Sequence, residues 1–144
     1  MNAKCKQTDQ LLHKAAGDLT GPQYELCAAI IEFLLSDRAK PLRHITYKTL
    51  VNEVGLEDEN PQNQVYLIYV TDYLSSGKLH LLDIQFQFID PQTDEPIPID
   101  SDTLSYALDS GNFYHPENGA LIHNFKRYIF PFFTPSAELS QLHD

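Results

Sequence analysis

The sequence of 144 residues has no apolar run near the roughly eighteen residues that a bilayer-spanning helix needs. Its start, MNAKCKQTDQLLHKAAGD, also lacks the continuous apolar stretch of a secretory signal. No membrane association is expected, and we predict a cytoplasmic protein. The two cysteines, Cys5 and Cys27, are too few for a disulfide framework or a cysteine-based metal site, so both are expected to be free thiols.

Positive charge is scarce in the middle of the chain. Lys78 is the only basic residue between positions 49 and 125, which contain thirteen acidic residues, and the formal net charge of the whole chain is -10. Residues 1–48 are mildly positive, with seven basic and five acidic residues. An anionic surface repels phosphate and attracts cationic partners in a salt-dependent way. The alternative is that these acids only keep the protein soluble.

Catalytic signatures are absent. The chain contains no GxSxG, GxxxxGK[ST], GxGxxG, HExxH or CxxC sequence, and its six histidines are scattered. The acid-rich stretch at 90–102 lacks both the spacing and the central glycine of a calcium-binding EF-hand loop. We therefore predict no catalytic residues, no cofactor and no metal ligands, and we expect that the protein is not an enzyme.

Three helices are predicted in the first half. Apolar residues at spacings of three and four predict a central core helix from Pro22 to Asp37. A second helix follows Thr46 as N-cap and ends at Gly55. Asn60 and Pro61 start a third, which Gly77 closes, although the β-branched and aromatic residues at 65–74 fit a strand equally well.

After the third helix the apolar period changes to two. Leu82, Ile84, Phe86 and Phe88 alternate with polar residues, which predicts a half-buried strand. A turn and the short stretch 97–100 complete a hairpin, and Pro98 confines that second strand to an edge.

The remaining residues predict a C-terminal extension. A fourth helix is expected over 102–111, burying Leu104, Ala107 and Leu108, and it is followed by a turn-rich loop. The aromatic residues from Phe125 onward recur at spacings of three and four, which predicts a short amphipathic helix ending before Pro131.

The stretch ITYKTLVNEVGL, which begins at Ile45, resembles the second helix of winged-helix domains, and residues 45–89 carry the resemblance. It implies an α+β fold: a winged-helix-like three-helix core with a β-hairpin wing, plus a small C-terminal helical and aromatic extension. The expected organisation is a polar leader at 1–21, the winged-helix-like domain at 22–100, the extension packed on the core at 101–136, and a polar tail at 137–144.

Winged-helix proteins that read DNA place Arg and Lys on the third helix and the wing. Here the third helix has neither, and the wing turn DPQTDEP has three acids. DNA is therefore disfavoured as a partner because phosphate contacts supply most non-specific affinity.

We expect a small non-enzymatic interaction protein that binds a basic protein surface, as an inhibitor, an antitoxin-like partner or a nucleic-acid-mimic adaptor. The alternative is a winged-helix DNA-binding transcriptional regulator. The partner-binding residues predicted from charge are Glu57, Asp58, Glu59, Asp72, Asp90, Asp94 and Glu95.

Overall fold

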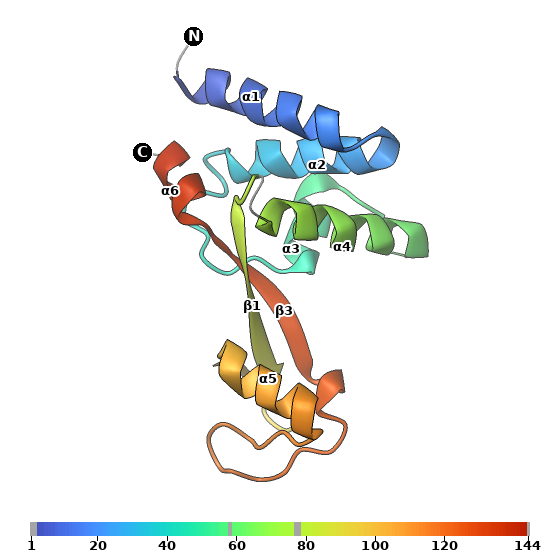
Figure 1. Ribbon diagram of the computed structural model, residues 1–144, viewed down its shortest axis with the longest axis vertical. Helices are drawn as coiled ribbons and strands as arrows, with labels where there is room; N and C mark the ends of the chain where they lie inside the picture. Colours follow the sequence, from blue (N-terminus) through green and yellow to red (C-terminus); the bar gives the residue numbers. More distant parts are fainter. Residues whose placement is uncertain (1–2, 58, 77–78, 144) are drawn as a thin grey trace. The chain divides into compact units, whose positions relative to one another are not determined.

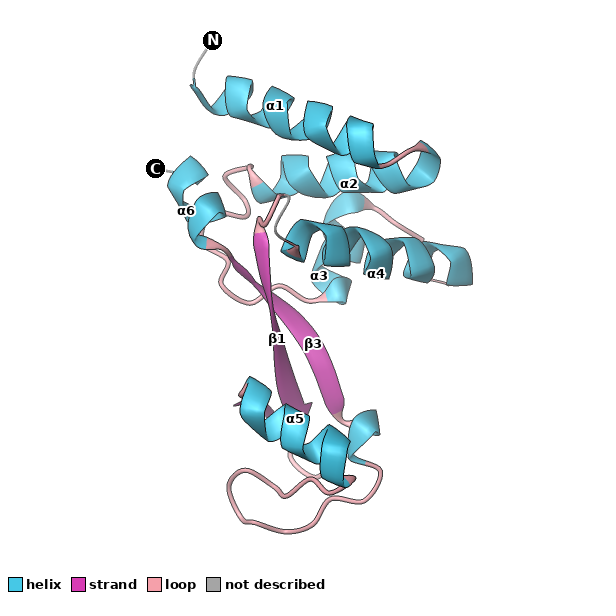
Figure 2. Ribbon diagram, viewed as in Figure 1, coloured by secondary structure: helices cyan, strands magenta, loops and turns pink. Residues whose placement is uncertain are grey.

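The computed structural model describes residues 3–57, 59–76 and 79–143, and in this part the chain is an α+β protein with six α-helices and a three-stranded antiparallel sheet (Figures 1 and 2). The chain divides into two compact units. Unit 1 comprises Met1–Asp83 and Phe133–Asp144, and unit 2 comprises Ile84–Phe132. Unit 2 is thus one continuous chain segment, whereas unit 1 combines α1 to α4 with α6. The expected boundaries near residues 21, 100 and 136 do not coincide with the limits of these units.

The elements follow one another in a simple order. They are α1 (Ala3–Asp18), α2 (Gly21–Leu34), α3 (Tyr47–Val54), α4 (Pro61–Ser75), β1 (Leu82–Ile89), β2 (Pro96–Ile99), α5 (Ser101–Ser110), the 3₁₀ turn η1 (Phe125–Arg127), β3 (Ile129–Pro135) and α6 (Ala137–His143).

Helix α2 is the centre of unit 1, as its wide apolar stripe predicts. Cys27, Ile30, Ile31 and Leu34 are fully buried along it, and α1, α3 and α4 all pack against it (Figure 1). Burial raises the pKa of the Cys27 thiol to about 12, so this cysteine behaves as a small core residue rather than as a nucleophile.

Helices α3 and α4 begin where the capping residues predict. The Thr46 hydroxyl accepts from the Thr49 backbone N–H at 3.2 Å, and the Thr49 hydroxyl accepts from the Thr46 N–H at 3.3 Å. Gly55 ends α3 with a φ of 71°, the left-handed conformation that glycine adopts without strain. Asn60 caps α4, which stays helical through 65–74; the predicted stop at Gly77 lies outside the described residues.

Residues 1–21 do not form a polar leader in the described part. They contain α1, whose Ala15 is completely buried and which packs on α2 and α6. Its few apolar residues, Leu11, Leu12 and Ala15, together with Leu19 just after its end, recur at helical spacing and pack into the core of unit 1. The predicted polar tail likewise forms α6, which buries Leu139.

The predicted hairpin is present, with Phe86 opposite Ile99 and Phe88 opposite Ile97. The predicted alternation along β1 is only partly correct: Ile84 is 47% exposed, whereas Gln87 is 6% exposed. Leu82 belongs to the core of unit 1 and Phe88 to the core of unit 2. One strand that serves two cores does not keep one buried face along its length.

The predicted amphipathic helix from Phe125 is wrong. Only Phe125–Arg127 form a 3₁₀ turn, and Ile129–Pro135 form strand β3 at one edge of the sheet, whose order is β2-β1-β3. Branched and aromatic residues with two prolines suit an edge strand better than a helix. Phe133 also pairs with Ile45, the residue just before the N-cap of α3, through two backbone hydrogen bonds of 2.8 and 2.6 Å.

Unit 2 has its own aromatic core. Phe88 is fully buried, and its ring lies 5.1 Å from that of Phe113, which in turn packs on Phe125. Helix α5 covers this core with Ala107, and Leu104 is partly buried. The predicted burial of Leu108 is wrong: this side chain is 55% exposed, because it lies at the margin of the helix face that Ala107 buries.

Candidate protein-interaction surface

Helix α4 exposes an apolar face. Val65, Ile68 and Tyr69 are 59%, 55% and 51% exposed, and their spacing of three and four residues places them side by side on the helix. Asp72 continues the same face and is also exposed. We call Val65, Ile68, Tyr69 and Asp72 the outer face of α4. Adjoining apolar side chains left in water on one helix are typical of a surface that meets a partner.

The opposite side of α4 is buried in unit 1. Leu67, Val70 and Leu74 are fully buried there, and Thr71 is 1% exposed. The hydroxyl of Thr71 donates to the backbone carbonyl of Leu67 at 2.8 Å, so it is satisfied inside the helix. The helix is therefore apolar on both sides, although packing within its unit uses only one of them.

Three of the charge-predicted residues belong to α4 or to the turn before it. Glu57 and Glu59 are exposed in the turn before α4, and Asp72 lies on the face itself. The side chain of Asn63 donates to the Glu57 carbonyl at 2.9 Å, which fastens this turn to the first turn of the helix. Asp58, also predicted, lies outside the described residues.

The other three predicted residues belong to unit 2. Asp94 and Glu95 are exposed in the turn between β1 and β2, where Asp94 has a φ of 60°. They remain available to a partner. The structure thus divides the predicted acidic set between the two units instead of confining it to one.

Asp90 has a different role from the one its charge predicts. Its Oδ1 accepts the Gln92 N–H at 2.9 Å, and its Oδ2 accepts from Nε2 of His115 at 2.8 Å. Nδ1 of that ring accepts the backbone N–H groups of Glu117 and Asn118, at 3.1 and 3.4 Å. Both ring nitrogens are thus engaged, and the His115 side chain is 6% exposed. The pair holds the loop after α5 in place and offers no free base to a substrate.

This pair predicts acid sensitivity in unit 2. The hydrogen bond from His115, followed by that from Gln92, holds the pKa of Asp90 below its usual value. A lowered folded-state pKa stabilises the fold above the ordinary carboxyl pKa of about 4, and this stabilisation is lost as pH falls through the folded-state value. The free energy of unfolding can be measured in urea at pH 6 and at pH 3.5. Between these two pH values it should fall less for Asp90→Asn than for the wild type.

The amide oxygen introduced by Asp90→Asn can still accept from His115, so the fold of this variant should be retained at pH 6. Asp100, which caps α5 and whose pKa is also lowered through the Thr103 backbone, keeps part of the acid dependence in both proteins. An identical pH dependence in the two proteins would show that the Asp90 contact contributes nothing.

A second histidine joins two carboxylates within unit 1. Nε2 of His80 lies 2.6 Å from Oδ1 of Asp83, and Nδ1 lies 3.4 Å from Oε2 of Glu138 on α6. The bond to Asp83 raises the pKa of His80. This contact therefore stabilises the fold at pH values below the ordinary histidine pKa. The stabilisation is lost as the pH rises through the raised pKa of His80.

Among the residues that the structure describes, no group of three or more His, Cys, Asp or Glu side chains could hold a metal ion. No helix in that part of the chain has the length and apolar character to cross a bilayer. Arg38, one of the basic residues before α3, pairs with Glu53 at 3.0 Å and lies over the ring of Phe33.

Comparison with known proteins adds no relative. No protein-family model matches the chain, and no match was found among curated proteins or solved structures.

Proposed function

We propose that this chain is a non-enzymatic interaction protein that binds a basic protein surface through the outer face of α4. The observation that carries the proposal is the exposure of Val65, Ile68 and Tyr69, with Asp72 next to them, on a helix without a single Lys or Arg. Apolar anchors within a polar rim are how protein interfaces concentrate binding energy.

The charge next to this face selects the partner. Glu57 and Glu59 stand before the first turn of α4, and Asp72 stands among its exposed apolar residues. A partner that presents apolar side chains bordered by Lys or Arg complements this pattern, and long-range attraction speeds its encounter. A nuclease or other nucleic-acid-binding protein has such a surface, on which carboxylates take the place of phosphates. An inhibitor or antitoxin-like role fits this chemistry.

The winged-helix resemblance belongs to the same proposal. Helices α2, α3 and α4 are followed in sequence by β1, the order expected for such a domain, and the β1–β2 hairpin comes where the resemblance expects a wing, although its residues after Asp83 belong to unit 2. The pairing of Ile45 with Phe133 further supports a strand-like segment between α2 and α3. In this comparison α4 is the helix that would enter DNA, but its outer face is apolar and acidic and would neutralise no phosphate.

The test begins with capture from the host lysate and quantitative mass spectrometry. The captured protein is then purified, and its dissociation constant is measured at low and at physiological salt. We expect a basic partner whose affinity falls at least tenfold at low salt in the triple variant Glu57→Lys, Glu59→Lys, Asp72→Lys, with a smaller effect at higher salt.

The matched control is the triple variant Glu32→Lys, Asp109→Lys, Glu117→Lys, which changes the net charge equally at exposed positions that belong neither to α4 nor to the turn before it. It should bind the partner nearly as the wild type does. Equal losses of partner affinity in the two triple variants would show that the effect comes from net charge alone. Saturable binding of a 20-base-pair DNA duplex by the wild type at physiological salt would favour the regulator instead.

A further inference from the structure

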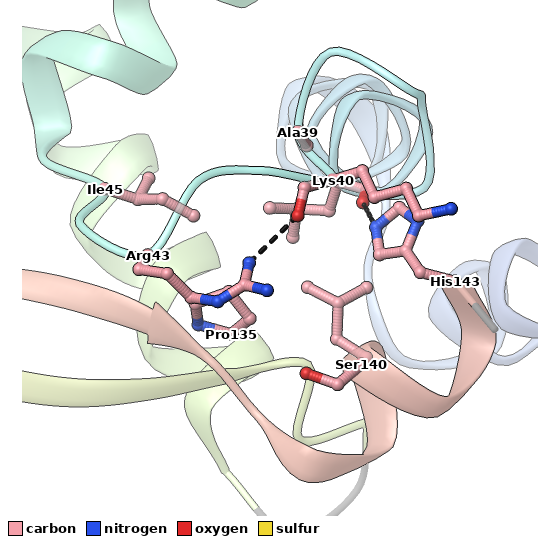
Figure 3. A pocket seen from close by; sticks show the side chains of 9 residues that line it. Ala39, Lys40, Arg43, Ile45, Pro135, Ser140 and His143 are labelled. Carbon is pink, nitrogen blue, oxygen red and sulfur yellow. Dashed lines mark hydrogen bonds between the residues drawn. The ribbon is translucent and has the colours of Figure 1, made fainter.

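A small cavity in unit 1 collects positive charge on this acidic protein (Figure 3). It lies among the segment after α2, the end of β3 and helix α6, and its volume is about 100 Å³. That volume exceeds the roughly 10–15 Å³ that one water requires but is well below the roughly 300 Å³ of pockets for drug-sized ligands. The cavity is therefore of a size for a single small polyatomic group.

The polar lining is cationic. Lys40, Arg43, Ser140 and His143 contribute to the wall, and no carboxylate of the described residues does. Two lining residues, Leu34 and Ile45, are fully buried and supply an apolar base. In Figure 3 the Arg43 side chain lies on the left of the cavity, His143 lies on the right, and the Lys40 side chain extends toward the His143 side. Donors that approach from different directions suit a ligand with several oxygen atoms.

The Arg43 side chain is held in place by the chain around it. Its Nη1 donates to the Lys40 and Leu42 carbonyls, both at 2.9 Å. The remaining guanidinium N–H groups form no ion pair with a carboxylate in the described part of the chain, and the same holds for the Lys40 ammonium. A fixed arginine with spare donors is a typical phosphate-binding group.

His143 provides an independent observation. Its Nε2 donates to the Leu34 carbonyl at 2.8 Å, which fixes the ring against the end of α2. Its Nδ1 is the only buried side-chain nitrogen or oxygen in the described residues that has no hydrogen-bond partner. Buried polar atoms are nearly always satisfied in native proteins, so this atom calls for a partner from outside the chain. Because Nε2 is the donor, Nδ1 is the acceptor of the ring, and the partner that it lacks is a donor such as the O–H of a phosphate group.

We propose that this cavity binds a phosphate group, with Arg43 and Lys40 as donors to its oxygen atoms, Nδ1 of His143 as the acceptor of a phosphate O–H, and the Ser140 hydroxyl as a further contact. The same chemistry accepts inorganic phosphate or a phosphomonoester on a larger molecule. The site is separate from the outer face of α4, and the inference does not depend on the function proposed above.

The experiment is an NMR titration of the full chain with inorganic phosphate at constant ionic strength, balanced with chloride. We expect saturable shifts at His143 and Ile45 in the millimolar range. Arg43→Gln and Lys40→Gln should each raise the dissociation constant about tenfold, and Lys48→Gln should leave it unchanged, because Lys48 is exposed and does not line the cavity. Lys40→Gln is the second variant in case loss of the Arg43 contacts disturbs the fold.

A parallel titration with O-phosphoserine distinguishes the free ion from a phosphomonoester. If both ligands bind, the site accepts an attached phosphate as well as the free ion. If inorganic phosphate alone binds, the site is specific for the free ion. Shifts that do not saturate, equal shifts with chloride alone, or equal weakening by Lys48→Gln would overturn the proposal.

Discussion

Replacing Tyr69 with alanine is expected to weaken binding of the captured basic partner about thirtyfold. An aromatic anchor at an interface typically contributes about 2 kcal/mol or more, and 1.4 kcal/mol corresponds to a factor of ten. Tyr69 is 51% exposed, so its truncation leaves no cavity in the core of unit 1. The free energy of unfolding should change by no more than about 0.5 kcal/mol. Calorimetric titration with the purified partner measures the change in affinity.

The chain offers a matched control for this substitution. Tyr106 is 58% exposed on α5 of unit 2, so Tyr106→Ala removes the same side chain from a second exposed helix face. It should leave partner affinity unchanged within about twofold. If Tyr106→Ala weakens binding and Tyr69→Ala does not, the interface belongs to unit 2 and the assignment to α4 is wrong.

Replacing Phe88 with alanine is expected to destabilise unit 2 by about 3–5 kcal/mol, the usual cost of truncating a fully buried phenylalanine. Phe88 is completely buried and its ring contacts those of Phe113, His115 and Tyr128. The core of this unit has only five buried apolar residues, so a cavity there cannot be filled readily by rearrangement.

Hydrogen exchange locates this loss. In Phe88→Ala, the amides of Ile89 and Ile122, which bond to Tyr128 and Phe113, should lose protection, whereas those of α2 and α4 keep it. The control is Phe130→Ala, because Phe130 is 43% exposed on β3 and its truncation leaves no comparable cavity. Simultaneous loss of protection in α2 and α4 would show that the two units unfold together.

Local capping chemistry allowed much of unit 1 to be predicted. Helix α3 lies between Thr46 and Gly55, and Asn60 with Pro61 starts α4. Each of these residues either satisfies a backbone hydrogen bond or favours the required backbone dihedral without help from distant parts of the chain. The same approach failed where the fold depends on distant pairing. The spacing of the aromatic residues from Phe125 onward predicts a helix ending before Pro131, yet Ile129–Pro135 form a strand because β1 and Ile45 supply backbone partners.

The weak apolar content of residues 1–21 concealed a docked helix for a related reason. A few residues at helical spacing, among them Ala15 and Leu19, bury themselves only because α2 provides an apolar face for them. Composition alone favoured a polar leader. Burial of such a helix is a property of its neighbour as much as of its own sequence.

The candidate surface was predictable in its charge but not in its apolar part. Glu57, Glu59 and Asp72 could be found by counting charges, and the structure leaves all three exposed. The exposed residues Val65, Ile68 and Tyr69 had no separate signal, because apolar side chains occupy both sides of α4 and periodicity cannot indicate which side packs inward. The sequence does indicate that α4 contains more apolar residues than one buried stripe needs.

The pairing of Asp90 with His115 had no sequence signal at all. The two residues are 25 positions apart, and their contact depends on how the loop after α5 folds over β1. Asp90 therefore looked equivalent to Asp94 and Glu95, although only those two remain exposed.

The most direct test of the central claim is NMR of the methyl groups of Val65 and Ile68 during titration with the captured basic protein and, separately, with duplex DNA. The claim that α4 presents a protein-binding face predicts saturable shifts of both methyl groups with the protein and none with DNA. Saturable shifts of these methyl groups with duplex DNA, or protein binding that leaves both unchanged, would contradict it.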